Sequence, residues 1–205
     1  MKTFKHLFLF VILFVINLSA QTEDKSLLTV DRIFNGMEFM GGRFRQARFI
    51  DNGKFYTVLE PSKDNPGGRD IVKYETESGN KEVMVPAKLL IPEGESKPLQ
   101  ISNYIWSSDK SKLMIFTNTE RVWRYNTRGD YYMLDLATNK LQKLGGNAKT
   151  SSLMFAKFSP DEKKVAYVSE HNIYCEDLST SKITQLTFDG SKTIINGTFD
   201  WVYEE

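Results

Sequence analysis

Beyond the first 20 residues, apolar and polar positions alternate with a period of two over short stretches, which predicts β-strands and argues against helices. One such pattern occurs three times: an aromatic residue, a tight polar turn and an alternating apolar run. Residues 104–116 and 156–168 are its clearest copies, with Trp106 and Phe158 in the aromatic position, and residues 47–58 are a weaker copy. Each copy therefore predicts two strands joined by a short turn.

A second pattern follows each copy of the first. Residues 131–144 match residues 173–186 position for position, with Asp135 opposite Asp177, and residues 70–83 are an earlier copy. Each copy predicts a hairpin whose turn is rich in Ser, Thr, Asn or Gly. Two hairpins make a four-stranded unit, and a repeat of roughly 40–50 residues is typical of β-propeller blades.

The fold predicted from these repeats is all-β, a partial β-propeller of about three to four four-stranded blades within residues 21–205. A β-sandwich is the alternative, because a single hairpin looks alike in both architectures. Repetition of the same pair of hairpins favours the propeller. A partial ring would leave sheet faces and edges uncovered, so we expect the chain to be a fragment of a larger propeller.

Residues 1–20 have the layout of a secretory signal peptide. Two lysines precede an apolar run between Leu7 and Ile16, and the segment closes with small residues at Ala20. The run is shorter than the ~20 apolar residues that span a bilayer. We therefore expect the leader to be removed and the protein to be secreted or periplasmic. An uncleaved leader that anchors the protein in a membrane is the alternative.

Charge and composition exclude several functions. The leader holds two of the 27 basic residues and no acidic one, so the remainder carries 25 basic and 26 acidic residues, a net charge of −1. This balance argues against a nucleic-acid partner, which would require a basic stripe. Cys175 is the only cysteine, so no internal disulfide can form, and a small buried hydrophobic residue is favoured over a nucleophile. Outside the leader His171 stands alone, so we expect no catalytic triad, no zinc site and no cofactor.

The second repeat contains an insertion. Its middle connection is ten residues longer than that of the third repeat, around residues 119–130. Insertions in propellers lie at strand connections, which carry binding groups on a rigid scaffold. This insertion holds Arg121, Trp123, Arg124 and Arg128, and arginine presents a planar fork of donors that suits carboxylates and carbonyl oxygens. The alternative is solvated charges with Trp123 packed beneath them. The Arg-Gly-Asp tripeptide at residues 128–130 is too short to establish an integrin ligand.

The last ten residues are the other unusual stretch. Asp200 could cap a short helix beginning at Trp201, and the adjacent carboxylates of Glu204 and Glu205 could bind an ammonium group. On a surface such a pair contributes little, so ordinary solvated charges are the alternative. Asn196-Gly-Thr is also an N-glycosylation sequon, which matters only where exported proteins are glycosylated.

Two of these stretches resemble a known family. The string Asp200-Trp-Val-Tyr-Glu-Glu205 is similar to the signature with which dipeptidyl peptidase IV-like enzymes present their glutamates. Trp123-Arg124, followed by residues 131–136, is similar to the arginine-bearing segment of the same family. The first string is specific, whereas the blade motifs are general to propellers. The resemblance covers most of the chain after the leader.

The resemblance implies an eight-bladed propeller that covers an α/β-hydrolase domain, whose Ser, Asp and His this chain lacks. It implies that Arg124 binds the carbonyl oxygen of the penultimate substrate residue. The family's string ends in three glutamates, of which the second and third bind the substrate's N-terminal ammonium group. Glu205 would then be the first of the working pair, with Glu204 as a neighbour and its partner one residue further on.

The function implied by the resemblance is the propeller portion of an exported serine-type dipeptidyl aminopeptidase. Such an enzyme removes X-Pro or X-Ala dipeptides from peptides with a free N-terminus, and its family forms homodimers. No catalytic residue is expected in this chain. A non-catalytic exported propeller that binds or scaffolds a partner is the main alternative. A related peptidase of different specificity, such as one that releases tripeptides, is a further one.

Overall fold

The computed structural model describes residues 26–36, 38–41, 46–122 and 124–199. It divides into two compact units, Met1–Phe44 and Arg45–Glu205. The predicted leader, Trp123, the predicted cap Asp200 and the acidic pair of Glu204 and Glu205 lie outside the described residues. No helix within the described ranges is long and apolar enough to cross a membrane.

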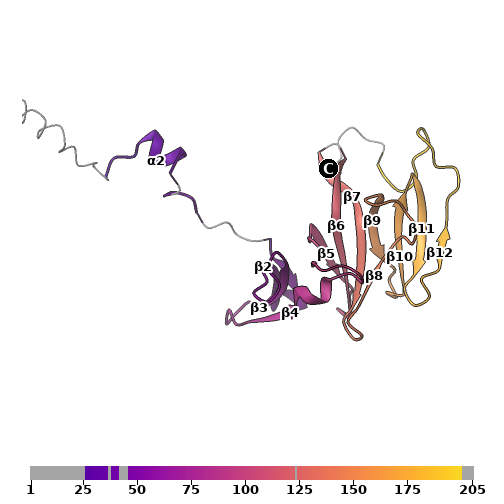
Figure 1. Ribbon diagram of the computed structural model, residues 1–205, viewed down its shortest axis with the longest axis horizontal. Coiled ribbons are helices and arrows are strands. Elements are labelled where there is room, and N and C mark those ends of the chain that lie inside the picture. The colour runs from indigo at the N-terminus through magenta and orange to yellow at the C-terminus, as the bar shows by residue number, and fades with distance from the viewer. Residues whose placement is uncertain (1–25, 37, 42–45, 123, 200–205) are drawn as a thin grey trace, which may run out of the picture. The chain divides into compact units, whose positions relative to one another are not determined.

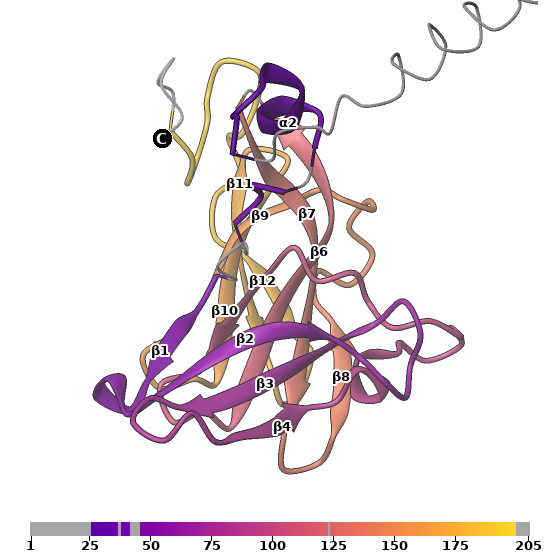
Figure 2. The same ribbon diagram turned by 90° about the vertical axis from the view of Figure 1, so that its left-hand side faces the viewer.

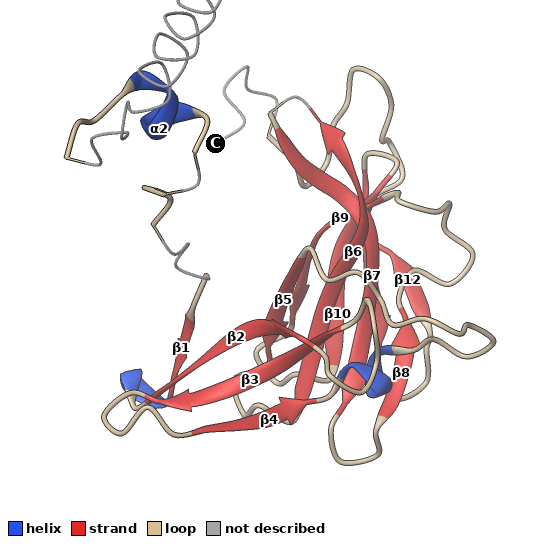
Figure 3. Ribbon diagram, turned by 60° about the vertical axis from the view of Figure 1, so that its left-hand side comes forward, coloured by secondary structure: helices blue, strands red, loops and turns tan. Residues whose placement is uncertain are grey.

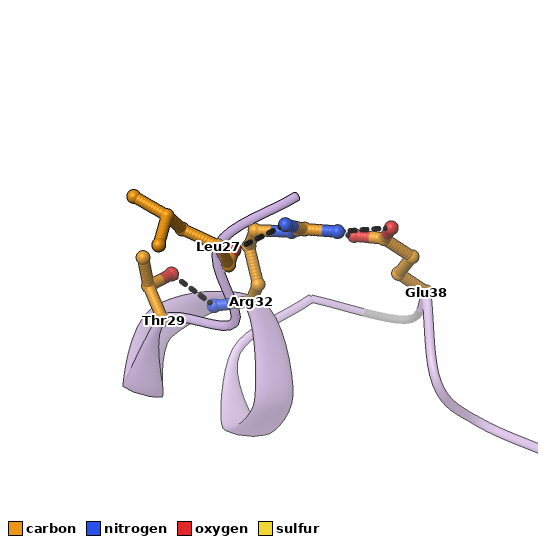
Figure 4. A network of polar contacts seen from close by, with 4 residues as sticks. All are labelled: Leu27, Thr29, Arg32 and Glu38. Atoms are coloured by element: carbon orange, nitrogen blue, oxygen red, sulfur yellow. Dashed lines mark hydrogen bonds and ion pairs between the residues drawn. The ribbon is translucent and has the colours of Figure 1, made fainter. Parts of the chain in front are cut away.

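The first unit contains one described helix, α2 (Val30–Phe34), which begins after Thr29. The Thr29 hydroxyl caps it by accepting a hydrogen bond from the backbone N–H of Arg32 at 3.2 Å. The Arg32 guanidinium donates to both carboxylate oxygens of Glu38, at 2.6 and 3.0 Å, and to the carbonyl oxygen of Leu27 (Figure 4). These bonds from Arg32 lower the pKa of Glu38. No residue of α2 is buried, so polar contacts define this turn.

The regular secondary structure of the second unit is almost entirely β-strand (Figures 1 and 3). In chain order they are β1 (Arg48–Ile50), β2 (Phe55–Pro61), β3 (Arg69–Glu75), β4 (Lys81–Val85), β5 (Asn103–Trp106), β6 (Lys112–Val122), β7 (Tyr125–Asp135), β8 (Lys140–Lys143), β9 (Leu153–Phe158), β10 (Lys164–Ser169), β11 (Asn172–Asp177) and β12 (Ile183–Gln185). Two 3-10 turns, Asp51–Gly53 and Ala87–Leu90, lie in the connections.

The strands form double hairpins in the order that the sequence predicts. β1 to β4 make one antiparallel sheet in which each strand is hydrogen-bonded to the next, and β5 to β8 and β9 to β12 repeat this arrangement. Trp106 pairs with Leu113 in the second group, and the matching Phe158 pairs with Val165 in the third. The same register in both copies confirms the predicted blades.

Aspartates at matching positions of the repeat form the tight turns. The Asp109 carboxylate accepts hydrogen bonds from the backbone N–H of Ser111 at 2.8 Å and from the Ser107 hydroxyl at 2.7 Å. Asp161 accepts one from the Ser159 hydroxyl at 2.6 Å. These bonds lower the pKa of both carboxyl groups, because they stabilise the charged form. Asp109 and Asp161 therefore stabilise the tight turns of the repeat.

Apolar side chains fill the space between neighbouring groups of strands. Successive residues of a strand face opposite ways, so Leu113 and Ile115 of β6 pack toward the first group while Met114 packs toward the third. The first cluster comprises Ile71, Val85, Leu90, Ile101, Tyr104, Leu113, Ile115 and Leu134. The second comprises Met114, Tyr131, Met133, Leu144, Leu153, Ala156, Val165, Tyr167 and Leu178. The middle blade is consequently covered on both faces.

Two buried glutamates link the second and third groups. Glu162 accepts hydrogen bonds from the backbone N–H groups of Ser108 and Asp109, the latter at 3.2 Å. Glu176 is 1% exposed and accepts a hydrogen bond from the N–H of Gly145 at 2.8 Å. A hydrogen bond to a charged group contributes about 1.5–3 kcal/mol. Each carboxylate therefore stabilises the contact between two blades as well as the turn that it binds.

The second and third groups also share backbone hydrogen bonds. β7 pairs with β9 through Arg128 with Met154 and Gly129 with Leu153. One sheet therefore runs in the order β12-β11-β10-β9-β7-β6-β5, and β8 pairs with β7 beside that path. The repeat gives no sign of this join, because the bonds come from the part of β7 that the insertion adds.

Candidate functional site

The insertion in the second repeat forms a hairpin extension, residues 117–130, which we call the arm. It consists of the outer parts of β6 and β7, and Figures 2 and 3 show these two strands extending past the ends of their neighbours. Thr117 pairs with Asp130, and Val122 pairs with Tyr125 near the tip. The insertion lies at the predicted strand connection. It extends both strands as a hydrogen-bonded pair, so the backbone of the arm follows the pairing of β6 with β7.

Side-chain contacts across the arm reinforce its pairing. The Asn126 amide donates to the Thr119 hydroxyl at 2.9 Å, and Arg128 forms an ion pair with its register partner Glu120 at 2.6 Å. The ion-pair side chains are 44% and 53% exposed, and such pairs contribute about 0–1 kcal/mol. Their main effect is to fix the register of the two strands.

The predicted arginines occupy different places on the arm. Arg124 lies in the turn at the tip, and Arg121 lies near the tip on β6; both are exposed. Arg128 lies lower on β7 and pairs with Glu120, so it supports the arm. The structure thus brings Arg121 and Arg124 to the same end of the arm. It does not describe the glutamates that the resemblance assigns to the same site.

The Arg-Gly-Asp tripeptide is part of β7. Gly129 is buried and paired with Leu153 of β9, and Asp130 is only 5% exposed. A Cβ atom on Gly129 would lie 2.5 Å from the Phe116 ring and 2.7 Å from the carbonyl oxygen of Thr117. Glycine is therefore required for packing at this position. The tripeptide is not displayed as a ligand for a receptor.

A hollow of about 450 Å³ lies beside the arm. Glu120 and Arg128 line one side of it, and Lys149, Glu170 and His171 contribute from loops of the third group. Lys149 forms an ion pair with Glu170 at 2.5 Å, which lowers the pKa of the Glu170 carboxyl group. Because the charges pair within the walls, the hollow suits a neutral polar ligand, such as a stretch of peptide backbone, better than a free ion.

A smaller hollow of about 180 Å³ lies on the arm's aromatic side, among Phe116, Tyr131, Phe155 and Thr127. The rings of Phe116 and Tyr131 stack with centroids 4.6 Å apart. Burial raises the pKa of Tyr131 to about 12, so its phenol is neutral at physiological pH. Among the described groups, the buried Thr127 hydroxyl has no hydrogen-bond partner. This hollow suits a small, mainly apolar side chain that carries one polar group to pair with the Thr127 hydroxyl.

Two further residues singled out in the sequence lie away from the arm's tip. Cys175 is half-buried in β11 between Ala166 and Thr184 of the neighbouring strands. Cys175 is therefore more exposed than the small buried hydrophobic residue expected from the sequence. His171 is exposed in the turn between β10 and β11, with a left-handed backbone at φ 64°. This agrees with the loop expected there.

The residues that sequence reasoning missed lie at the base of the arm. Asn118, Asp130 and Ser151 are joined there by side-chain hydrogen bonds. Asp130 was visible only as the end of the Arg-Gly-Asp tripeptide, and Ser151 lies 21 residues further along the chain. The ten-residue insertion is the one sequence signal that points to this region, because a longer hairpin needs additional support at its base.

Comparisons with known proteins agree with this architecture. Residues 107–205 match the family model of the dipeptidyl peptidase IV (DPP IV) N-terminal region. A crystal structure of Porphyromonas gingivalis dipeptidyl peptidase 4 superimposes with a TM-score of 0.69 at 28% sequence identity. That superposition covers 87% of this chain and 24% of the solved chain.

Curated fungal proteins are similar over much of the chain. A probable dipeptidyl-aminopeptidase B of Talaromyces stipitatus is 27% identical over 184 residues, which are 87% of this chain and 20% of that protein. The dipeptidyl aminopeptidase B of Saccharomyces cerevisiae is 32% identical over 136 residues, which are 66% of this chain and 16% of that protein. The chain therefore spans about a sixth to a fifth of the length of these relatives.

Proposed function

Because this chain belongs to the dipeptidyl peptidase IV family, we propose that it is the N-terminal propeller portion of a serine-type dipeptidyl aminopeptidase. The complete enzyme removes X-Pro or X-Ala dipeptides from peptides with a free N-terminus. In this proposal the nucleophile and its partners belong to a hydrolase domain, and the present chain binds and orients the substrate. The observation that carries the proposal is the position of Arg124, which lies exposed in the turn at the tip of a hydrogen-bonded arm.

Arg124 binds the carbonyl oxygen of the penultimate residue of the substrate. A guanidinium group donates several hydrogen bonds from a planar fork and keeps its charge at any physiological pH. A paired hairpin restricts the turn at its tip more than a loop of the same length would. The arginine can therefore fix the position of a substrate carbonyl relative to the scissile bond.

Glu205 binds the ammonium group of the substrate's N-terminus, with Glu204 beside it and a partner one residue further on. A charge-assisted hydrogen bond of this kind contributes about 1.5–3 kcal/mol. Together with Arg124 it sets the distance between the free amine and the cleaved bond at two residues. Substrates with a blocked N-terminus would lose this anchor and be cleaved poorly.

The enzyme acts outside the cytoplasm in this proposal. The basic start, the apolar run and the small-residue ending of residues 1–20 support export by a cleaved signal peptide. An extracytoplasmic location would expose the enzyme to peptides with free N-termini.

The test is steady-state kinetics of the complete protein on an X-Pro chromogenic dipeptide substrate. Arg124→Ala should lower kcat/KM about tenfold to hundredfold, as expected for the loss of a hydrogen bond from a charged donor. The N-acetylated substrate should be cleaved at a small fraction of the rate of the free one. Arg69→Ala, which removes an exposed arginine of β3, is the matched control and should change kcat/KM less than twofold.

Active-site labelling with a fluorophosphonate should show the same reactive serine in both variants, so that any loss reflects substrate binding. Equal kcat/KM for Arg124→Ala and the wild-type enzyme would contradict the role of Arg124. A complete protein that neither reacts with the label nor cleaves dipeptide substrates would instead favour a non-catalytic binding module.

A further inference from the structure

Three residues from three segments meet at the base of the arm. Asn118 belongs to β6, Asp130 belongs to β7, and Ser151 lies in the connection between β8 and β9. We call this group the base clasp. It lies where the arm leaves its blade and where the second and third blades begin to share backbone hydrogen bonds.

The base clasp is a closed circuit of hydrogen bonds. The Asp130 carboxylate accepts one from the Asn118 amide at 2.9 Å and one from the backbone N–H of Ser151 at 2.9 Å. The Ser151 hydroxyl donates to the carbonyl oxygen of Asn118 at 2.6 Å. Each member contacts both others, so a displacement of either arm strand stretches at least two bonds.

The carboxylate of the clasp is almost completely enclosed. Asp130 is 5% exposed and Ser151 is 4% exposed. The ammonium group of Lys143 lies 3.5 Å from Asp130 and balances its charge. A buried carboxylate is stable only when its oxygens are paired, which ties the clasp residues to one arrangement.

The backbone at the clasp adopts left-handed conformations that these hydrogen bonds maintain. Asn118 has φ 46° and Ser151 has φ 56°, values that non-glycine residues adopt rarely. The register of the arm shifts between the pair of Thr117 with Asp130 and the pair of Glu120 with Arg128, in the stretch that contains Asn118, and it shifts again between Glu120 and Val122. Such a bulge bends a strand and changes its direction. The clasp therefore fixes the direction in which the outer arm leaves the blade.

We infer that Asp130 is a positioning residue, which acts through the base clasp to hold the turn that carries Arg124 in the orientation that binds substrate. This inference rests on the proposed function of Arg124. Asp130 itself touches no substrate. Its effect on activity is transmitted by the direction of the arm.

Hydrogen exchange of the complete protein tests the structural half of the inference. Asp130→Ala should speed amide exchange at residues 119–128 at least tenfold and leave β10 and β11 within twofold. Ser151→Ala, which removes one bond of the three, should act in the same direction but less strongly. Glu176→Gln is the matched control, because Glu176 is also a buried carboxylate that binds a backbone N–H of a neighbouring blade, and it should leave the arm unchanged.

Unchanged exchange at residues 119–128 in Asp130→Ala would overturn the inference. Equal acceleration in every strand would also overturn it, because it would mean that Asp130 only stabilises the fold.

A double-mutant cycle tests the link to Arg124. Asp130→Ala should lower kcat/KM on the X-Pro substrate about tenfold, mainly by raising KM, while fluorophosphonate labelling stays at the wild-type rate. In an Arg124→Ala background the same change should cost less than a further twofold, because the group that it positions is already absent. A full tenfold loss in that background would overturn the inference.

The measurements distinguish a failure of the proposed function of Arg124 from a failure of the positioning role of Asp130. If Arg124→Ala alone keeps the wild-type kcat/KM, the proposed function of Arg124 fails, and the inference that Asp130 positions it fails with it. The exchange measurement would still decide whether Asp130 fixes the arm. If Arg124→Ala is impaired but Asp130→Ala is not, the proposed function stands and Asp130 has no positioning role.

Discussion

Glu176 and Leu134 occupy the same position in two copies of one hairpin, and both are almost completely buried, yet one is a carboxylate and the other is aliphatic. Leu134 packs in the apolar cluster between the first and second groups of strands. The Glu176 carboxylate accepts hydrogen bonds from the N–H of Gly145 at 2.8 Å and from the Tyr167 hydroxyl at 3.3 Å. One position in the repeat therefore serves two kinds of contact between blades.

The pairing of Glu176 predicts an asymmetric response to substitution. Glu176→Leu matches the other copy but leaves the N–H of Gly145 and the hydroxyl of Tyr167 without this acceptor. Unpaired buried groups cost about 1–3 kcal/mol each, so we expect the free energy of unfolding to fall by about 2–6 kcal/mol. Glu176→Gln keeps an acceptor oxygen and should cost less than about 1.5 kcal/mol. Calorimetry of both variants checks this, and a Glu176→Leu protein as stable as the wild type would contradict it.

The close packing around Gly129 predicts that any larger side chain at this position destabilises the arm. Gly129→Ala places a Cβ atom against the Phe116 ring and the Thr117 carbonyl oxygen, and the backbone oxygen cannot move without breaking the pairing of β6 with β7. Overpacking of this kind costs about 1–3 kcal/mol. Thermal unfolding should show the loss. Gly41→Ala is the control, because its Cβ would meet nothing within 4 Å. Equal midpoints for the two variants would argue against close packing at Gly129.

The lowered pKa of Asp177 predicts that this carboxyl group contributes to the loss of stability in acid. Hydrogen bonds from the Ser179 hydroxyl and the Thr180 N–H lower the pKa of its carboxyl group to about 2. A carboxyl group whose pKa is lower in the folded than in the unfolded state stabilises the fold above the unfolded pKa, ~3.9, and loses that effect as the pH falls through the folded value. Asp177→Asn should therefore lower Tm at pH 6 and make little difference near pH 2. A carboxyl titration near pH 4, measured by NMR, would refute this.

The proposed substrate site predicts unequal roles for the adjacent glutamates. Because the resemblance assigns Glu205 to the working pair and Glu204 to a neighbouring place, Glu205→Gln should lower kcat/KM at least tenfold and Glu204→Gln less than threefold, in line with the loss of about 1.5–3 kcal/mol at a charged hydrogen bond. Both variants keep the size of the side chain. Kinetics with free and N-acetylated X-Pro substrates check the assignment. A larger loss for Glu204→Gln would shift the register of the pair by one residue.

Much of the blade architecture could be predicted from the sequence, because it depends on local patterns. The alternation of residues 104–116 and 156–168 predicts strands, and the aspartates within both stretches form the turns expected between them. The matched register of Trp106 and Phe158 follows from the same spacing. The position of Arg124 in an insertion was also visible, since the insertion is defined by comparing two repeats.

Contacts between blades could not be predicted in this way. The join of β7 to β9 pairs Arg128 and Gly129 with residues about 25 positions further along the chain, and such a distant backbone pairing has no signature in one sequence. The same holds for Glu162 and Glu176, whose backbone N–H partners lie outside the third group of strands. The burial of Asp130 could not be predicted either, because its partners Asn118 and Ser151 come from other segments of the chain.

The backbone join between β7 and β9 has a consequence for how this protein can change over evolution. Propellers grow by duplication of whole blades, and a blade whose neighbours contact it only through side chains can be exchanged as a module. Here a separation of the second and third blades would break the backbone pairing of Arg128 with Met154 and of Gly129 with Leu153, and would expose these edges of β7 and β9. These two blades should therefore be inherited as a pair.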